Sequence, residues 1–171
     1  PDNAICLSTR GAIRFFFRRE FDAAAVDLER ALAVLPSYAM AMLSMANLCA
    51  VRHEFNEART WMEQALLVDP LDVGMNMNMG DHCILQRRYA DAVTALQRAL
   101  ELSPQHRPSQ LRLSWALALA DRYDEARSLL AAIAAASGVD ATWQEYSALA
   151  AGAAGDRAAA NQHWHALQTI A

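Results

Sequence analysis

Apolar residues along this chain recur at intervals of three and four, in stretches separated by short polar breaks or by proline. This spacing is typical of amphipathic helices, and no window shows the strict alternation of a strand. The polar breaks join the stretches in pairs as helical hairpins, and they fall at residues 18–20, 53–54, 87–88, 121–122 and 155–156. The pattern therefore predicts an all-α protein built from antiparallel helix pairs.

The hairpins repeat with a period of 34 residues. Pro36, Pro70 and Pro104 are 34 residues apart, and Gly138 takes the next place. Four further columns keep this interval: Ala24, Ala58, Ala92, Ala126 and Ala160; Ala12, Ala46, Gly80, Ser114 and Ala148; Phe21, Phe55, Tyr89 and Tyr123; and Leu28, Met62, Leu96, Leu130 and Trp164. We therefore predict a single array over residues 5–171, with repeat units 5–38, 39–72, 73–106, 107–140 and 141–171.

The columns have packing roles. Small residues on the first helix and alanines on the second allow the two backbones to approach closely, because larger side chains would push them apart. Proline ends the second helix, since it lacks an N–H and its φ is fixed. Each pair then buries its apolar face chiefly against its neighbours, which is the construction of a solenoid. Trp61 lies next to a packing column and is expected to pack as well.

This pattern resembles the tetratricopeptide repeat family, which has a 34-residue period, a small residue, a later alanine-to-aromatic step and a closing proline. The best-matching stretches are FNEARTWMEQALLVDP at 55–70 and YADAVTALQRALELSP at 89–104. The fifth unit departs from the pattern with Arg157 in the aromatic column. The family's early tryptophan is replaced by Ser8, Met42, Asn76, Gln110 and Gln144. The resemblance implies a right-handed superhelical solenoid whose first helices line a concave binding side.

Candidate binding residues follow from that resemblance. The stripe of each first helix that is not used inside its hairpin is mostly apolar, which favours a peptide-binding groove over a surface that meets only water. For Met40 and Leu43, packing against the adjacent repeat is an equal alternative, and Phe15 is expected to fill the core while Phe16 faces elsewhere. The predicted groove comprises Thr9, Ile13, Phe16, Met40, Leu43, Asn47, Met77, Asn78, Asp81, Ile84, Leu111, Arg112 and Trp115.

Some members of the family hold a peptide's C-terminal carboxylate with five polar residues. Asn47, Asn78 and Arg112 match three of them, whereas the two lysines of that set fall on Leu43 and Pro108. One arginine would bind a carboxylate weakly, so this tail-binding function is not transferred. Asparagine side chains can instead pair with the main chain of an extended peptide.

Composition narrows the class of partner. The net charge is −4, and the basic residues, all arginine, are scattered singly or in pairs, so nucleic acid is a poor candidate ligand. No apolar run approaches the ~20 residues of a membrane span.

Cys6, Cys49 and Cys83 show no close pairing, which argues against a disulfide framework and a zinc site. Cys49 and Cys83 are expected to be buried, inert thiols.

Catalytic arrangements were sought without result. The run Asp81-His82-Cys83 contains the residue types of a nucleophile and base, but adjacent residues on a helix point about 100° apart and cannot meet. His163 and His165 diverge in the same way, since a helical zinc pair needs a spacing of three or four. We therefore expect no enzyme activity, no cofactor and no metal.

The sequence thus predicts an adaptor or chaperone-like module that binds a protein or peptide segment in an apolar groove. Two alternatives remain open. The opening RG…FDAAAVDLERALAVLPSYAMA is similar to the repeat regions of winged-helix regulators, which suggests a sensory or oligomerising region of a larger bacterial transcriptional regulator. A scaffold in a secretion, pilus or exopolysaccharide assembly is the other. The chain opens on Pro-Asp-Asn, so we expect a fragment of a longer protein in the cytoplasm, with a periplasmic location left open.

Both ends of the predicted array lack a covering neighbour. The last helix presents Trp164, Leu167 and Ile170, and the first helix opens with Ile5 and Leu7. A repeat needs a neighbour or a polar cap over its apolar face. We therefore expect either weak homo-oligomerisation through the terminal helices or a C-terminal continuation.

Overall fold

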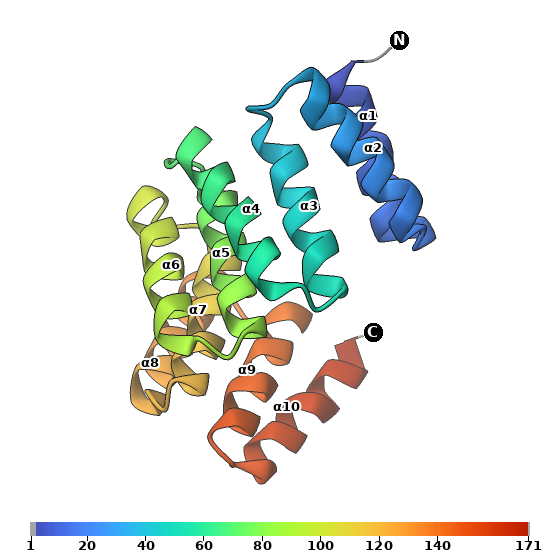
Figure 1. Cartoon of the computed structure of the whole chain (residues 1–171). Helices are drawn as coiled ribbons and strands as arrows, with labels where there is room; N and C mark the ends of the chain where they lie inside the picture. The colour runs from blue at the N-terminus through green and yellow to red at the C-terminus, as the bar shows by residue number, and fades with distance from the viewer. Residues whose placement is uncertain (1–2, 171) are drawn as a thin grey trace. The chain divides into compact units, whose positions relative to one another are not determined.

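The computed structural model describes residues 3–170, which contain helices and no strand (Figure 1). The elements are α1 (Ala4–Ile13), the π-helical turn η1 (Arg14–Arg18), α2 (Phe21–Val34), α3 (Ala39–Val51), α4 (Phe55–Val68), α5 (Val73–Leu85), α6 (Tyr89–Leu102), α7 (Arg107–Leu119), α8 (Tyr123–Ser137), α9 (Ala141–Ala153) and α10 (Arg157–Ile170). Ala171, the end of the fifth predicted repeat, lies outside the described residues. The all-α prediction is confirmed.

The chain forms two compact units, with the division inside α5. Unit 1 runs through Met75, and unit 2 begins at Asn76. Within unit 1, α1 packs against α2 and α3 against α4; within unit 2, α7 packs against α6, α8 and α9, and α9 packs against α10. The second helices end at Val34, Val68 and Leu102, each two residues before a proline of the 34-residue series. The periodic prolines therefore end the helices as predicted.

The turn inside each hairpin repeats in backbone conformation as well as in sequence position. Arg19, His53, Arg87, Asp121 and Gly155 all have positive φ and are spaced by 34 residues. In the second repeat the N–H of Glu54 donates to the carbonyl of Cys49 at 2.9 Å, and the equivalent bond recurs in the later repeats. This is the left-handed cap that closes many helices, usually with glycine. Only the last of the five positions is glycine, so four other residues carry the strain of a positive φ.

The first repeat holds one residue more between its cap and its left-handed turn than the others. The Asn3 side chain caps α1 by accepting from the backbone N–H groups of Ile5 and Cys6. The other first helices begin one place later in the period, at Ala39 for α3. The extra residue is accommodated by η1, where the N–H of Arg19 donates to the carbonyl of Arg14 in a π-type bond.

This π turn changes which residue of α1 faces α2. A Cβ on Gly11 would lie 2.9 Å from Cγ of Leu28, just as a Cβ on Gly80 would lie 2.6 Å from Cγ of Leu96. Leu28 and Leu96 occupy the same place in the period. The small residue at this crossing is therefore Gly11, one position before the predicted Ala12, and the prediction is wrong at this point because the 34-residue frame ignores the π turn.

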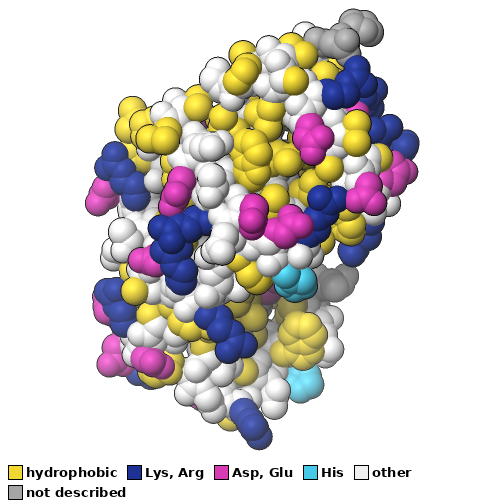
Figure 2. All heavy atoms as spheres, in the orientation of Figure 1, with side chains coloured by type: hydrophobic (Ala, Val, Ile, Leu, Met, Phe, Trp, Pro, Cys, Tyr) yellow, Lys and Arg dark blue, Asp and Glu magenta, His cyan; other side chains and the backbone are white. Residues whose placement is uncertain are grey.

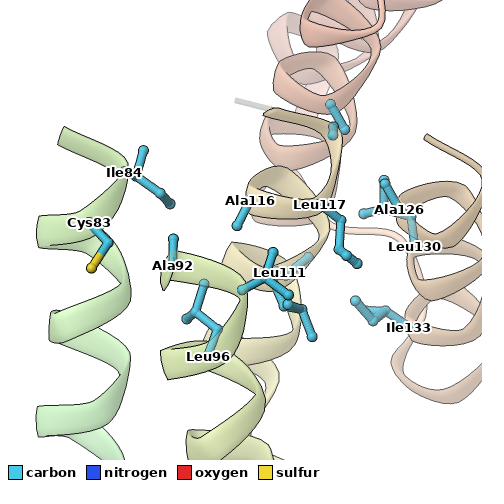
Figure 3. Packing of buried hydrophobic residues seen from close by; sticks show 14 residues of the cluster. Cys83, Ile84, Ala92, Leu96, Leu111, Ala116, Leu117, Ala126, Leu130 and Ile133 are labelled. Carbon is cyan, nitrogen blue, oxygen red and sulfur yellow. The ribbon is translucent and has the colours of Figure 1, made fainter. Parts of the chain in front are cut away.

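The core follows the predicted alanine column in the first four repeats, whereas Ala160 of the fifth repeat is only partly buried. Ala24, Ala58, Ala92 and Ala126 are fully buried, and Trp61 packs against the core of unit 1 as predicted. Figure 3 shows the core of unit 2, where side chains from α5, α6, α7 and α8 meet.

The terminal apolar residues differ from one another in burial. Leu7 is buried against the core of unit 1, so the expectation that it lacks cover is wrong: it packs in the core that includes Leu28 of α2. Ile5, Trp164 and Ile170 are about half exposed, and Leu167 is partly buried.

Candidate functional site

The first helices of unit 1 expose large apolar side chains. Phe16 is 58% exposed and Phe17 is 83% exposed, both on η1. Phe15 instead packs into the core, with its ring centroid 5.6 Å from that of Phe21. Three consecutive phenylalanines are thus divided between one that supports the fold and two that face outward. We name Phe16 and Phe17 the phenylalanine face; Ile13 of α1 and Met40 and Val51 of α3, a helix that packs against α1, are also exposed.

Of the remaining predicted groove residues of unit 1, two are partly buried and one is exposed. Leu43 is partly buried and packs beside Met42 and Met75, so the alternative of packing describes it well. Asn47 is also partly buried. Thr9 is exposed on α1, one turn before Ile13.

The predicted residues of unit 2 mostly contact one another or the core. Ile84 and Leu111 are buried, and Figure 3 shows both in the cluster of α5 to α8. They cannot contact a partner without unpacking, so we remove them from the candidate groove. Met77 and Trp115 are partly buried against the same cluster, and Asn78 is partly buried as well.

The predicted carboxylate-binding arginine already has a partner. Nε of Arg112 donates to both carboxylate oxygens of Asp81, at 3.0 and 2.8 Å. Burial raises the pKa of Asp81, and the neighbouring guanidinium opposes that rise. Beside this pair, the Trp115 ring lies edge-on to Tyr146 at a centroid distance of 6.4 Å. The side chains expected to receive a ligand in unit 2 therefore satisfy each other.

A buried ion-pair cluster joins α1 to α2 in unit 1 and has no counterpart in the sequence analysis. Arg10 binds Asp27 through Nε at 2.7 Å and Nη2 at 2.5 Å, and Nη1 of Arg14 lies 2.6 Å from the same carboxylate. Asp27 is only 1% exposed. The hydrogen bonds from Arg10, opposed by burial, hold the pKa of Asp27 below its ordinary value. The cluster holds α1 against α2 beside the phenylalanine face.

The side chains of Cys49, His82 and Cys83 are all buried. Cys49 and Cys83 are buried as predicted, and burial raises the pKa of the Cys49 thiol, which disfavours the reactive thiolate. Burial also lowers the pKa of His82. Within residues 3–170, no group of three or more His, Cys, Asp or Glu side chains is placed to hold a metal ion.

Unit 2 contains a cavity that the sequence pattern did not predict. It has a volume of about 500 Å³ and is lined by residues of α7 to α10. Its wall includes Leu130, Trp143, Ser147, Ala151 and His163. The signal was available in the sequence, because Ser147 and Ala151 are small residues at repeat positions where earlier helices have larger ones.

Acidic and basic side chains are interspersed on the face drawn in Figure 2 and form no single-sign patch there. Several of them pair locally, for example Arg59 with Glu63 and Arg98 with Glu101. None of the helices in the described part of the chain is long and apolar enough to cross a membrane.

Two family models match the chain, both described as tetratricopeptide repeat. One covers residues 9–72 and 52–107, and the other covers 84–152. A search of curated proteins found no significant match.

Many solved structures share the fold. A tetratricopeptide repeat protein from Parabacteroides merdae has a TM-score of 0.87 and 18% identity over 100% of this chain, which spans 66% of that protein. PilW, a type IV pilus biogenesis factor, has a TM-score of 0.81 and 24% identity over 99% of this chain and 78% of its own. YrrB, a repeat protein with an unusual peptide-binding site, has a TM-score of 0.68 and 21% identity over 99% of this chain and 87% of its own. The chain belongs to the tetratricopeptide repeat family.

Proposed function

We propose that this chain is a protein-interaction module without enzyme activity, and that unit 1 holds an apolar segment of a partner protein against the phenylalanine face. The observation that carries the proposal is the exposure of Phe16 and Phe17 on a fixed backbone. Aromatic side chains contribute large contact area at low entropic cost, and they are enriched among residues that dominate binding energy.

The surroundings of the two phenylalanines support this proposal. Phe16 packs its ring edge-on to Phe15 at a centroid distance of 4.7 Å, so it is supported from the core side. The Asp27 cluster fixes the helix that carries them. A rigid, apolar surface of this kind loses little freedom when a partner binds.

In unit 2, the predicted groove contributes less to the proposed function. A ligand carboxylate at Arg112 would have to displace Asp81, and a ligand at Leu111 would have to open the core. We keep Met77, Asn78 and Trp115 as secondary contacts, because each is partly exposed on a first helix. The regulator and assembly-scaffold alternatives would use the same fold in a longer protein, and identities below 25% to PilW and YrrB carry the fold alone.

The test compares two equally exposed apolar residues. Phe17 and Leu67 are each 83% exposed, but Phe17 belongs to the phenylalanine face and Leu67 lies on the second helix α4. Phe17→Asp, alone and with Phe16→Asp, should remove partner proteins captured from a lysate of the source organism. Leu67→Asp should retain them. Quantitative mass spectrometry of the captured proteins is the measurement, and equal losses with Leu67→Asp would contradict a specific role of the face.

A further inference from the structure

The cavity in unit 2 exists because α9 carries two small residues in packing positions. The 34-residue period places Ser147 where α7 has Leu113, and Ala151 where α7 has Leu117. Both leucines are buried in the core. The first helices α3 and α5 also carry larger residues at these places: Met45 and Met79 at the first, Cys49 and Cys83 at the second. The fifth repeat therefore lacks two side chains that fill the corresponding space in other repeats.

The wall of the cavity is apolar and rigid on one side. Nε1 of Trp143 donates to the carbonyl oxygen of Leu130 at 2.9 Å, which joins α9 to α8. The ring of His163 lies edge-on to Trp143 at a centroid distance of 5.4 Å, and Nδ1 of His163 is 2.8 Å from Oε1 of Gln144. The Trp143 ring is thus held from both neighbouring helices and presents a fixed flat surface.

The charged side chains of the wall are already engaged. Arg127 forms an ion pair with Asp124. Oδ1 of Asp156 accepts from the backbone N–H of Ala159 at 3.0 Å. An anionic ligand would lose its hydration beside the Asp156 carboxylate and an Arg127 that is already paired, which is unfavourable in an apolar site. The wall therefore disfavours an anionic ligand.

One buried polar group of the wall has no partner. Among the described residues, Oγ of Ser147 makes no hydrogen bond, and Ser147 is 3% exposed. Such groups are rare in native proteins because an unpaired buried hydroxyl destabilises the fold. Rotation of the side chain between staggered rotamers turns the hydroxyl toward a molecule in the cavity.

We propose that this cavity binds a small, uncharged, mainly aromatic molecule that carries one hydrogen-bonding group. Its ring lies against Trp143 and its polar group pairs with Oγ of Ser147. The cavity volume is within the range of about 300–1,000 Å³ that is usual for small-molecule sites. The site is lined by residues of α7 to α10, all in unit 2, so it stands independently of the phenylalanine face of unit 1.

The first experiment tests the chemistry of the ligand. Indole is the probe, with toluene as its apolar comparison and benzoate as its charged one, and binding to the full chain is followed by ¹⁵N–¹H NMR. Indole should shift the Trp143 side-chain N–H and the amides around Ser147, and should bind at least about tenfold more tightly than benzoate. Ser147→Ala should weaken indole about fivefold and leave toluene unchanged, because only indole uses the hydroxyl.

The second experiment fills the cavity. Ser147→Leu with Ala151→Leu restores the residues that α7 carries and should abolish indole binding. Gly152→Ala is the control on the same helix, since an added Cβ there meets nothing within 4 Å, and it should keep full binding. If the filled variant fails to fold, judged by circular dichroism, the selective loss with Ser147→Ala carries the test.

Two results would overturn the proposal. One is unchanged indole affinity in the filled variant. The other is an absence of indole binding up to its solubility limit; a higher Tm of the filled variant would then identify the cavity as a simple packing void.

Discussion

Leu43 in unit 1 and Leu111 in unit 2 are the same residue at the same place in the repeat, yet their surroundings differ. Leu111 is 1% exposed inside a cluster of buried residues from five helices, α5 to α9, whereas Leu43 is only partly buried. The same contrast separates Phe16 and Met40 of unit 1, which are exposed, from Arg112 of unit 2, which is paired with Asp81. A position in the repeat therefore specifies the backbone but not whether its side chain is available to a partner.

Asp27 of unit 1 and Asp81 of unit 2 differ in burial and in how their carboxylates are paired. Asp27 is buried and held by two arginines, and it joins a first helix to the second helix of the same repeat. Asp81 is 34% exposed and held by one arginine, and it joins the first helices of consecutive repeats. The first pair stabilises a hairpin, and the second occupies the stripe where a ligand was expected.

The largest expected effect comes from removing the arginines of unit 1. Arg10→Met with Arg14→Met removes both arginines that hydrogen-bond to the buried Asp27 carboxylate and leaves only the charge of Arg30 acting on it, so it should lower the free energy of unfolding by about 3–5 kcal/mol. Arg112→Met should cost about 1 kcal/mol or less, because Asp81 remains partly hydrated. Urea denaturation followed by circular dichroism measures both. Similar losses would show that the two pairs do not differ as described.

The same variants have a pH signature. The folded-state pKa of Asp27 is lowered, so its contribution to stability is complete above the unfolded pKa and is lost as pH falls through the folded pKa. In the double arginine variant, burial without the arginines should raise that pKa instead. The difference in stability between the double variant and the wild type should therefore shrink as the pH is lowered.

A smaller effect separates the two leucines. Leu111→Ala should lower the free energy of unfolding by about 2–5 kcal/mol, since it empties a fully buried site. Leu43→Ala removes the same atoms from a half-open site and should cost less than half as much. Thermal and urea unfolding of both variants provide the comparison. Equal costs would mean that Leu43 is as much a core residue as Leu111.

The smallest effect tests the register of the first helix. Gly11→Leu places a side chain against Leu28 and should cost about 1–3 kcal/mol by overpacking. Ala12→Leu occupies a partly open position and should change stability by a few tenths of a kcal/mol. The reverse order would show that the 34-residue frame, rather than the π turn, describes α1 correctly.

The sequence was sufficient to predict features that depend on local pattern. The alanine column, the proline-terminated second helices and the buried Cys49 and Cys83 all follow from spacing and residue type. The register of α1 could not be read from the period, since it depends on a cap at Asn3 whose extra residue is absorbed by η1. The pairing of Asp81 with Arg112 could not be predicted from the sequence either, because it joins residues 31 positions apart on different helices.

The turn η1 has a consequence for how such proteins diversify. It absorbs a single inserted residue without disturbing any repeat downstream, because the left-handed turn at Arg19 keeps its phase with His53 and the later turns. The inserted residue rotates the helix upstream by about 100°, which exchanges the side chains that face outward. One codon gained or lost in the RFFFR segment would thus exchange the outward-facing side chains of α1 in one step, whereas point substitutions would have to exchange them individually.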